Sequence, residues 1–562
     1  MNSTNNKHKI IKKSNVFLVS YFSILIFIMS LPLLQNTFIV GDDWQYHLSR
    51  IQNIADCLSV GIFPAKIHIT SLNGYGYGSG LFYPNLFLYF PAILRVLGLT
   101  LSASYKIFLI VVVTFIIISS YFSTKYIFKS RYAAILTATL FITSQAVITN
   151  IYFRFAIGES IASIFLPIVM AALYNIVYDG FSKPWILVLG FLGLVYCHTI
   201  SLFLIGIIFS FGLIINLKTI FLNLNNKIKF LINLFASAFV VLALSISYWG
   251  PMLEQFYFLK FNVNAAHSNL ESQAFSLISM FHYIRPGVGM ILLLLSIIII
   301  IISKKNVKFG QSCIISGIVL VVLSTNIFKW ELLNNTIIDK IQFPWRLHPL
   351  ASFLLSVGVS GCINFNFCKI KQREFFIVII FTLTSMLSIN VLNELATINT
   401  IYLPEDICNQ YYSIGGGQEW LPLNTDISLL NSPDKVYTSN DEVIQLSKKT
   451  GNILYFEYDE NIYGKCDYFD VPLVFYKGYS ASILTPDGAI KKLNVVNSPN
   501  NNLCRVINDK NQKYGEVCIK YSGTKLQKIS YLINFLAMIV IGILNFVAKN
   551  KESKAQLMID SK

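Results

Sequence analysis

Two neighbouring segments indicate the class of fold: the apolar run VFLVSYFSILIFIMSLPLL at residues 16–34 and the polar run GDDWQYHLSR at residues 41–50. The first is uncharged and about as long as a helix that crosses a bilayer, which needs about 20 residues. Lysines precede it, but it is long for a signal-peptide core, and no small-residue cleavage pattern follows. We therefore predict a retained first span with the N-terminus in the cytoplasm.

Similar apolar runs recur along the 562 residues, which are 54% hydrophobic and 13% charged. A soluble domain carries about 25% charged residues, and backbone in lipid must satisfy its own hydrogen bonds as helix. The sequence predicts a polytopic α-helical membrane protein. The expected spans, about 12, are residues 16–34, 105–124, 132–150, 160–178, 185–197, 199–217, 230–249, 288–303, 311–327, 347–363, 375–390 and 527–548.

The net charge of +16 is concentrated in short patches between the apolar runs. Every segment assigned to the cytoplasm is basic, and these segments hold 21 of the 44 lysines and arginines, including the C-terminal tail. This is the bias of cytoplasmic loops and excludes nucleic-acid binding as its cause. The first outer loop is then long, from about 35 to 104, and its short apolar piece 84–99 is expected to be re-entrant or interfacial.

Residues 391–526 differ in character, since they hold 16 of the 28 acidic residues and strand-like runs such as ILYFEYDE and VPLVFYKGYSASI. We predict a transmembrane core at 1–390, a small β-rich extracytoplasmic domain at 391–526, and a final helix with a cytoplasmic tail at 527–562. Four cysteines of this segment are predicted to form one or two disulfides, with free thiols as the alternative: Cys408, Cys466, Cys504 and Cys518.

Asp42 and Asp43 precede a predicted helix at 43–60, on which Asp43, His47 and Arg50 share one stripe and apolar residues share another. An amphipathic helix on the outer membrane surface fits this pattern and holds an acid pair over the membrane mouth. The alternative is an ordinary surface helix that Asp42 and Asp43 merely cap.

The glycine-rich run GYGYGSG at 74–80 permits tight turns, and Tyr75 and Tyr77 are candidates for stacking on a sugar. A flexible aromatic loop at the headgroup level is the alternative.

Three charged positions and one histidine also fall at predicted outer ends of spans. Arg154 and Glu159 join two spans, either as functional groups or as a structural pair. His198 lies at a turn, where a histidine is a catalytic candidate or a structural hydrogen-bonding group. Arg346 suits a phosphate through forked hydrogen bonds, or else snorkels at the interface.

Several runs carry a resemblance to a known family: GDDWQYHLSRIQNIADCLSVGIFPAKI, GYGYGSGLFYPNLFLYFPAILRVLG, YFRFAIGESIASIFLP, CHTIS, IQFPWRL, VPLVFYKGYSA and VCIKYSGTKLQKISYLI. In order and spacing they resemble a bacterial membrane-protein family labelled 6-pyruvoyl-tetrahydropterin-synthase-related, a label that implies no pterin chemistry here. That family is similar to the GT-C superfamily of membrane glycosyltransferases, which act outside the cytoplasm on polyprenyl-phosphate-linked sugars.

The resemblance implies an inverting transfer of a sugar from a polyprenyl-phosphate donor to an envelope glycan or lipid acceptor at the bacterial cytoplasmic membrane. Asp42 or Asp43 matches the acidic catalytic position, and Glu159 is the candidate second acid. Mg²⁺ or Mn²⁺ is a possible cofactor on Asp42, Asp43 or Glu159. A transporter or flippase for a lipid-linked glycan, or a non-catalytic envelope assembly factor, remains the alternative function.

Overall fold

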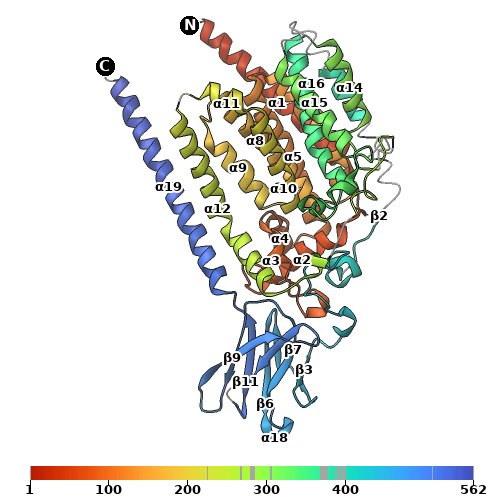
Figure 1. The fold of residues 1–562 in the computed structure, drawn as a ribbon, viewed down its shortest axis with the longest axis vertical. Coiled ribbons are helices and arrows are strands. Elements are labelled where there is room, and N and C mark those ends of the chain that lie inside the picture. The colour runs from red at the N-terminus through yellow and green to blue at the C-terminus, as the bar shows by residue number, and fades with distance from the viewer. Residues whose placement is uncertain are drawn as a thin grey trace. The chain divides into compact units, whose positions relative to one another are not determined.

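The structure is a computed structural model that describes residues 2–224, 226–265, 269–278, 285–303, 307–366, 377–386, 389, 393, 400–404, 406–508 and 511–560. The chain divides into two compact units that alternate along the sequence. The first, here the helical unit, comprises residues 1–47, 98–231 and 267–405. The second, here the sheet-bearing unit, comprises residues 48–97, 232–266 and 406–562. Figure 1 traces the elements of both.

The helical unit consists of apolar helices joined by short turns. Its helices are α1 (Asn2–Ser30), α5 (Leu101–Phe128), α6 (Arg131–Ile142), α7 (Gln145–Ile148), α8 (Ile157–Tyr178), α9 (Pro184–Val195), α10 (Thr199–Ile215), α11 (Leu217–Asn223), α14 (Met290–Ile302), α15 (Lys308–Leu323) and α16 (His348–Asn366). A π-helical turn, η4 (Thr149–Phe153), follows α7, and a 3-10 turn, η8 (Pro344–Leu347), precedes α16. Helices α5, α6 and α8 pack together, as do α15 and α16 (Figure 1).

Close approach of α15 and α16 depends on glycine. A Cβ added at Gly358 would lie 2.6 Å from Ile314 and 2.7 Å from the carbonyl oxygen of Gly310. Small residues let helix backbones approach within a membrane, where helix association relies on close packing rather than on a hydrophobic driving force.

The span count of about 12 is not confirmed. Among the described residues, six helices are long and apolar enough to cross a membrane: Asn15–Leu34, Leu101–Phe128, Ile157–Tyr178, Lys227–Phe258, Pro344–Phe365 and Lys525–Leu544. Two more arise if each bent pair is one span, since Arg131–Ile142 meets Gln145–Phe153 at 49° and Thr199–Ile215 meets Leu217–Asn223 at 65°. The other expected spans contain apolar helices of 10–17 residues. Part of the expected span 375–390, at each of its two ends, lies outside the described residues.

The sheet-bearing unit joins short helices, a long helix pair and one antiparallel sheet. Its helices are α2 (Trp44–Ser59, whose first turn belongs to the helical unit), α3 (Ser79–Phe82), α4 (Tyr89–Val96), α12 (Lys227–Phe258), α13 (Asn262–Ala265), α18 (Glu460–Tyr463) and α19 (Lys525–Asp560). The expected interfacial piece is observed as η3 (Leu86–Leu88) and α4, too short to span.

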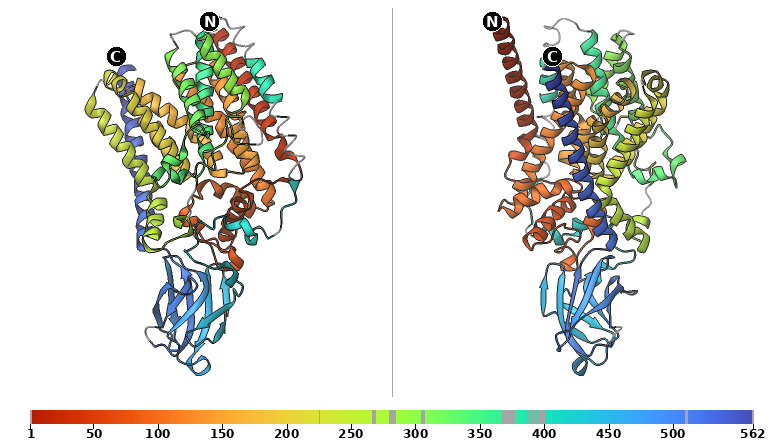
Figure 2. Two further views of the ribbon diagram at one scale, coloured as in Figure 1. Left: turned by 45° about the vertical axis from the view of Figure 1, so that its right-hand side comes forward. Right: turned by 90° about the vertical axis from the view of Figure 1, so that its left-hand side faces the viewer.

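Helices α12 and α19 run side by side (Figure 2). The side chain of Asn534 donates to the carbonyl of Leu244 at 2.9 Å and accepts the N–H of Ser247 at 3.2 Å. Gly250 faces Ser530 at the same contact. An interhelical amide and small residues are the features that hold apolar helices together in lipid.

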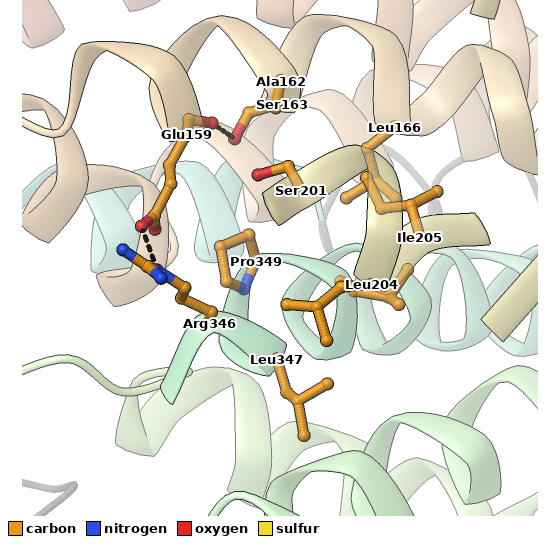
Figure 3. A pocket seen from close by; sticks show the side chains of 11 residues that line it. Glu159, Ala162, Ser163, Leu166, Ser201, Leu204, Ile205, Arg346, Leu347 and Pro349 are labelled. Carbon is orange, nitrogen blue, oxygen red and sulfur yellow. Dashed lines mark hydrogen bonds and ion pairs between the residues drawn. The ribbon is translucent and has the colours of Figure 1, made fainter. Parts of the chain in front are cut away.

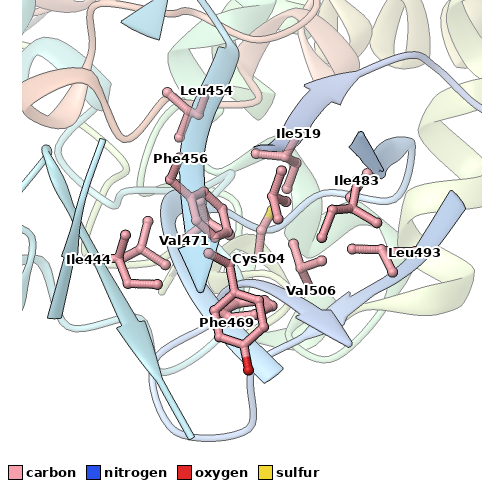
Figure 4. Packing of buried hydrophobic residues seen from close by; sticks show 14 of the residues in the cluster. Ile444, Leu454, Phe456, Phe469, Val471, Ile483, Leu493, Cys504, Val506 and Ile519 are labelled. Carbon is pink, nitrogen blue, oxygen red and sulfur yellow. The ribbon is translucent and has the colours of Figure 1, made fainter. Parts of the chain in front are cut away.

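Nine strands form the sheet in the order β4-β3-β7-β10-β9-β8-β11-β6-β5. They are β3 (Lys435–Thr438), β4 (Val443–Gln445), β5 (Lys448–Thr450), β6 (Ile453–Asp459), β7 (Tyr468–Val474), β8 (Tyr479–Leu484), β9 (Ile490–Asn497), β10 (Leu503–Ile507) and β11 (Tyr514–Tyr521). The sheet curves around one apolar core, because side chains from β4 at one end and β6 near the other meet in a single cluster (Figure 4). The predicted strands in ILYFEYDE and VPLVFYKGYSASI are confirmed as β6, β7 and β8.

The predicted disulfides are wrong, since the four late cysteines are free thiols. Cys504 is fully buried within the sheet core, Cys466 is buried beside it, and Cys408 is buried elsewhere, near Asn53. Cys518 pairs across the sheet with Tyr455 and Ser482, so its neighbours are not cysteines. The division of the chain at 390 and 526 stays a prediction.

Replacing Gly358 with alanine tests the α15–α16 contact. The added methyl group overlaps backbone, so we expect destabilisation of about 1–3 kcal/mol, read as a lower Tm of the purified protein in detergent. Gly206→Ala is the matched control, because nothing lies within 4 Å of a Cβ at Gly206. Equal Tm values for the two variants would contradict the close helix contact.

Candidate functional site

The acidic loop after the first span is fixed by its backbone. Asp42 donates its N–H to the carbonyl of Phe153 at 3.2 Å, and Asp43 donates to the carbonyl of Arg154 at 3.0 Å. A Cβ at Gly41 would lie only 2.3 Å from the Phe153 oxygen, so glycine is required for the loop to dock there. Asp43 then starts α2, since its carbonyl accepts the N–H of His47 at 3.1 Å. The loop thereby places two carboxylates beside the turn that carries Arg154.

Arg154 and Glu159 form a buried pair at the start of α8. The Nη1 atom of Arg154 lies 2.9 Å from Oε2 of Glu159, and Nη2 lies 3.3 Å from Oε1. Arg154 Nη1 also donates to Oδ1 of Asn150 at 2.8 Å. Both charged residues are less than a tenth exposed. A carboxylate in the first turn of a helix is further stabilised by the partial positive charge there.

Arg346 is the second cation on Glu159. Its Nε donates to Oε1 of Glu159 at 3.0 Å, and its Nη1 donates to the carbonyl of Ile341 at 2.6 Å and to Oε1 of Gln342 at 2.8 Å. We call Arg154, Glu159 and Arg346 the charged triad. One carboxylate between two guanidinium groups leaves the triad itself with one net positive charge, which the carboxylates of Asp42 and Asp43 face.

Asp43 is electrostatically part of this site. Asp42 and Asp43 are accessible to solvent, but protein surrounds the Asp43 carboxyl closely, and this desolvation raises its pKa to about 6. The positive charges of Arg154 and Arg346 oppose the rise, whereas Asp42 and Glu159 add to it. Desolvation also raises the pKa of Asp42, and Arg154 lowers it. A carboxyl with a pKa near 6 is ionised at neutral pH and can still accept a proton.

A narrow pocket opens beside the triad, with a cavity volume of about 20 Å³, which is room for about one water molecule (Figure 3). Figure 3 shows Glu159 and Arg346 on one side of the pocket and Leu166, Leu204 and Ile205 on the other, with Ser201 between them. The lining comes from α8, α10, η8 and α16, and its remaining residues are Ala162, Ser163, Leu347, Pro349 and Leu350. The pocket is therefore amphipathic along its length.

His198 caps the helix that contributes Ser201. Its Nδ1 accepts the N–H of Ser201 at 3.2 Å and lies 2.8 Å from the Ser201 hydroxyl oxygen. The cap fixes the first turn of α10, whose N-terminal N–H groups favour negative charge nearby. His198 also contributes electrostatically at Glu159. The structure places Asp42, Asp43, Arg154, Glu159, His198 and Arg346 close enough to interact electrostatically, all within the helical unit.

Tyr75 and Tyr77 do not offer faces to a sugar. Both rings are almost fully buried in the sheet-bearing unit, at 2% and 1% exposure. The Tyr77 hydroxyl donates to the carbonyl of Ile414 at 2.9 Å and accepts the N–H of Trp420 at 3.1 Å. The Tyr75 hydroxyl accepts the N–H of Ser432 at 3.2 Å. These bonds tie the glycine-rich run to residues 414–432 and give both tyrosines a structural role, which corrects the expected sugar contact.

His47 and Arg50 likewise depart from expectation. The expected helix is observed as α2, but it is not an exposed amphipathic helix, because His47 is only 3% and Arg50 only 1% exposed. Arg50 donates to the carbonyl of Pro84 at 2.7 Å and to Oδ1 of Asn85 at 2.8 Å, and its guanidinium lies 4.1 Å from the Tyr83 ring centre. A buried arginine with these partners stabilises the fold instead of binding a donor.

Some residues of the site were not anticipated from the sequence. Asn150 had a signal, since it lies four residues before Arg154 in an apolar helical run, a spacing that brings side chains together. Ser201 and Gln342 carried no such signal in the sequence, apart from lying near the candidates His198 and Arg346. The apolar end of the pocket was not identifiable, because every span supplies leucine and isoleucine.

A divalent metal does not fit Glu159. Both of its carboxylate oxygens are bound by guanidinium groups. Across the described part of the chain, no group of three or more histidine, cysteine or acidic residues is arranged to hold a metal ion. The adjacent carboxylates of Asp42 and Asp43 remain the candidates for any cation.

No protein-family model matches the chain, so the family resemblance of its motifs stays an expectation. An uncharacterized protein of Lactococcus lactis subsp. cremoris (strain MG1363) is 23% identical over 345 residues, which cover 55% of this chain and 54% of the relative.

Two solved structures from Archaeoglobus fulgidus are similar. One is an oligosaccharyltransferase complex with Zn and sulfate, with a TM-score of 0.36, 12% identity, and coverage of 67% of this chain and 53% of that one. The other is the oligosaccharyltransferase AglB with an inhibitory peptide and a dolichol-phosphate, with a TM-score of 0.36, 11% identity, and coverage of 69% and 57%. The chain spans about half the length of each of these relatives.

Glu159→Gln tests the charged triad. The amide leaves two buried guanidinium groups without a counter-charge, so we expect a loss of about 3–5 kcal/mol in folding stability. Thermal unfolding in detergent measures this. Glu457→Gln, at an exposed position on β6, is the same change without burial and should leave the Tm unaltered. A Glu159→Gln protein as stable as the control would show that the triad carries little electrostatic coupling.

Proposed function

We propose that this protein is a GT-C-type glycosyltransferase that moves a sugar from a polyprenyl-phosphate donor to an envelope glycan or lipid acceptor. The reaction takes place at the outer face of the bacterial cytoplasmic membrane, with both termini in the cytoplasm. The amphipathic pocket beside the charged triad is the observation that carries the proposal. The order and spacing of the motifs, which resemble a bacterial family that is similar to the GT-C superfamily, add to it.

The two ends of the pocket match the two ends of such a donor. The phosphate lies at the polar end, against Arg346, the Ser201 hydroxyl and the N-terminus of α10. The first isoprene units lie against Leu166, Leu204 and Ile205, where burial of apolar surface contributes about 25 cal/mol per Å². The guanidinium of Arg346 favours the leaving phosphate, whose charge grows during transfer.

Asp43 acts as the general base. Its carboxylate takes the proton of the acceptor hydroxyl while that oxygen bonds to the anomeric carbon of the sugar. The acceptor oxygen attacks from the face opposite the phosphate. The bond between the anomeric carbon and the phosphate oxygen breaks, its electron pair stays with the phosphate, and the configuration at the carbon inverts. Asp42 raises the proton affinity of Asp43 through its like charge. No step here is assigned to a metal.

Asp43→Asn tests the base. The amide keeps the shape of the side chain but cannot take a proton, so we expect transfer to be lost while the Tm stays near that of the native protein. Mass analysis of surface glycans from host cells with the native protein, the variant or neither measures the transfer and identifies the missing sugar. Full restoration of the glycan by Asp43→Asn and by Asp42→Asn would instead indicate a non-catalytic assembly factor.

The pH profile provides a second test. The base must be ionised, so activity should rise with pH through about 6 and level off above it. Asp42→Asn removes a negative neighbour, which lowers the pKa of Asp43 and shifts the rising limb to lower pH. Initial rates from pH 4.5 to 8 with a polyprenyl-phosphate sugar measure both curves. A rising limb that does not move in Asp42→Asn would argue against Asp43 as the titrating group.

A further inference from the structure

Five side chains in the helical unit form a continuous stack, which we call the aromatic column. The guanidinium of Arg346 lies 5.0 Å from the Phe343 ring centre, and Phe343 stacks on Trp345 at 4.4 Å with 13° between the planes. Trp345 in turn stacks on Phe275 at 4.8 Å and 12°. The guanidinium of Arg285 closes the far end, 5.5 Å from the Phe275 ring centre.

Trp345 is the central layer and lies near both cations of the triad. The Arg154 guanidinium is 6.0 Å from its ring, and Phe343 separates it from Arg346 by a single layer. Its indole N–H is buried and has no hydrogen-bond partner within the described residues. Buried tryptophans usually find such a partner. The ring faces of Trp345, and not its N–H, therefore determine where it sits.

The other side of the column belongs to a segment remote in sequence. The carbonyl of Phe275 accepts the N–H of Asn326 at 3.0 Å, and the Glu271 carboxylate accepts the N–H of Trp330 at 3.0 Å. The carbonyl of Arg285 accepts a hydrogen bond from the Gln145 side chain at 2.5 Å. Phe275 is thus anchored independently of the triad and can hold Trp345 against it.

We propose that Trp345 is a positioning residue for the anion subsite. Stacked on Phe275, its ring fixes the places of Arg154 and Arg346 on either side of Glu159, and so presents Arg346 to the phosphate of the donor. This rests on the proposed function, because the phosphate is the donor's. The role requires an aromatic face at position 345 and at position 275, but no hydrogen bond from the indole.

Binding of farnesyl phosphate by the full chain in detergent micelles tests this, with farnesol as the uncharged reference. Trp345→Leu keeps apolar bulk without a ring, and its Kd for farnesyl phosphate should rise on the order of tenfold while that for farnesol stays constant. Phe275→Leu breaks the column from its anchored side and should have the same sign of effect. Trp345→Phe keeps a stacking face and should bind within about threefold of the native protein.

Phe141→Leu is the matched control. Phe141 is buried in the same unit against Phe353, at 5.1 Å, so its loss lowers the Tm without touching either arginine. Unchanged farnesyl phosphate binding in both Trp345→Leu and Phe275→Leu would overturn the positioning role and leave the proposed donor site standing. Weak binding by Trp345→Phe, equal to that of Trp345→Leu, would overturn it as well, since the indole N–H would then be required. A native protein that binds farnesyl phosphate no better than farnesol would overturn the proposed function together with this inference.

Discussion

A carboxylate buried at the start of an apolar helix stays ionised only beside cations, and Glu159 meets this constraint with two of them. Arg154 reaches it from the end of a π-helical turn, and Arg346 reaches it from the 3-10 turn that precedes α16. The acidic loop then binds the backbone carbonyl groups at the end of the π-helical turn. One buried charge thus links three segments of the chain, and the first and the last of them are more than a hundred residues apart in the sequence.

Stability alone does not account for this arrangement. Removing two or three charged groups from water costs several kcal/mol for each ion. Apolar residues of similar volume often give the folded protein equal or greater stability. What the triad supplies is a fixed positive field in a place with little water, where a charge acts more strongly than at the surface. The same field holds the pKa of Asp43 below the value that burial by itself would give. The charges of the acidic loop and of the two arginines therefore affect each other's ionisation.

The sequence predicted the parts of this site that depend on local pattern and on the sorting of charge along the chain. It placed Arg154, Glu159, His198 and Arg346 at the same ends of apolar runs, and it located the helix after Asp43. It did not reveal the partners that decide burial. Arg50 is paired with Asn85, 35 residues away, and Tyr77 with a carbonyl 337 residues away. The sequence pattern of a glycine-rich aromatic run does not distinguish exposed rings from buried ones. The bends of 49° and 65° that shorten two spans also depend on packing that periodicity does not encode.

The pocket explains why the two arginines are not equivalent. Arg154 is held through both terminal nitrogens by Glu159 and Asn150, which fixes its plane against the acidic loop. Arg346 binds Glu159 through Nε and the Ile341 carbonyl and Gln342 side chain through Nη1, and it also lines the pocket. A guanidinium beside an apolar pocket suits a phosphate on a lipid tail, whereas a carboxylate alone at that point would repel it. Arg154 therefore keeps Glu159 charged and lowers the pKa of Asp43, whereas Arg346 lines the pocket in which we place the phosphate.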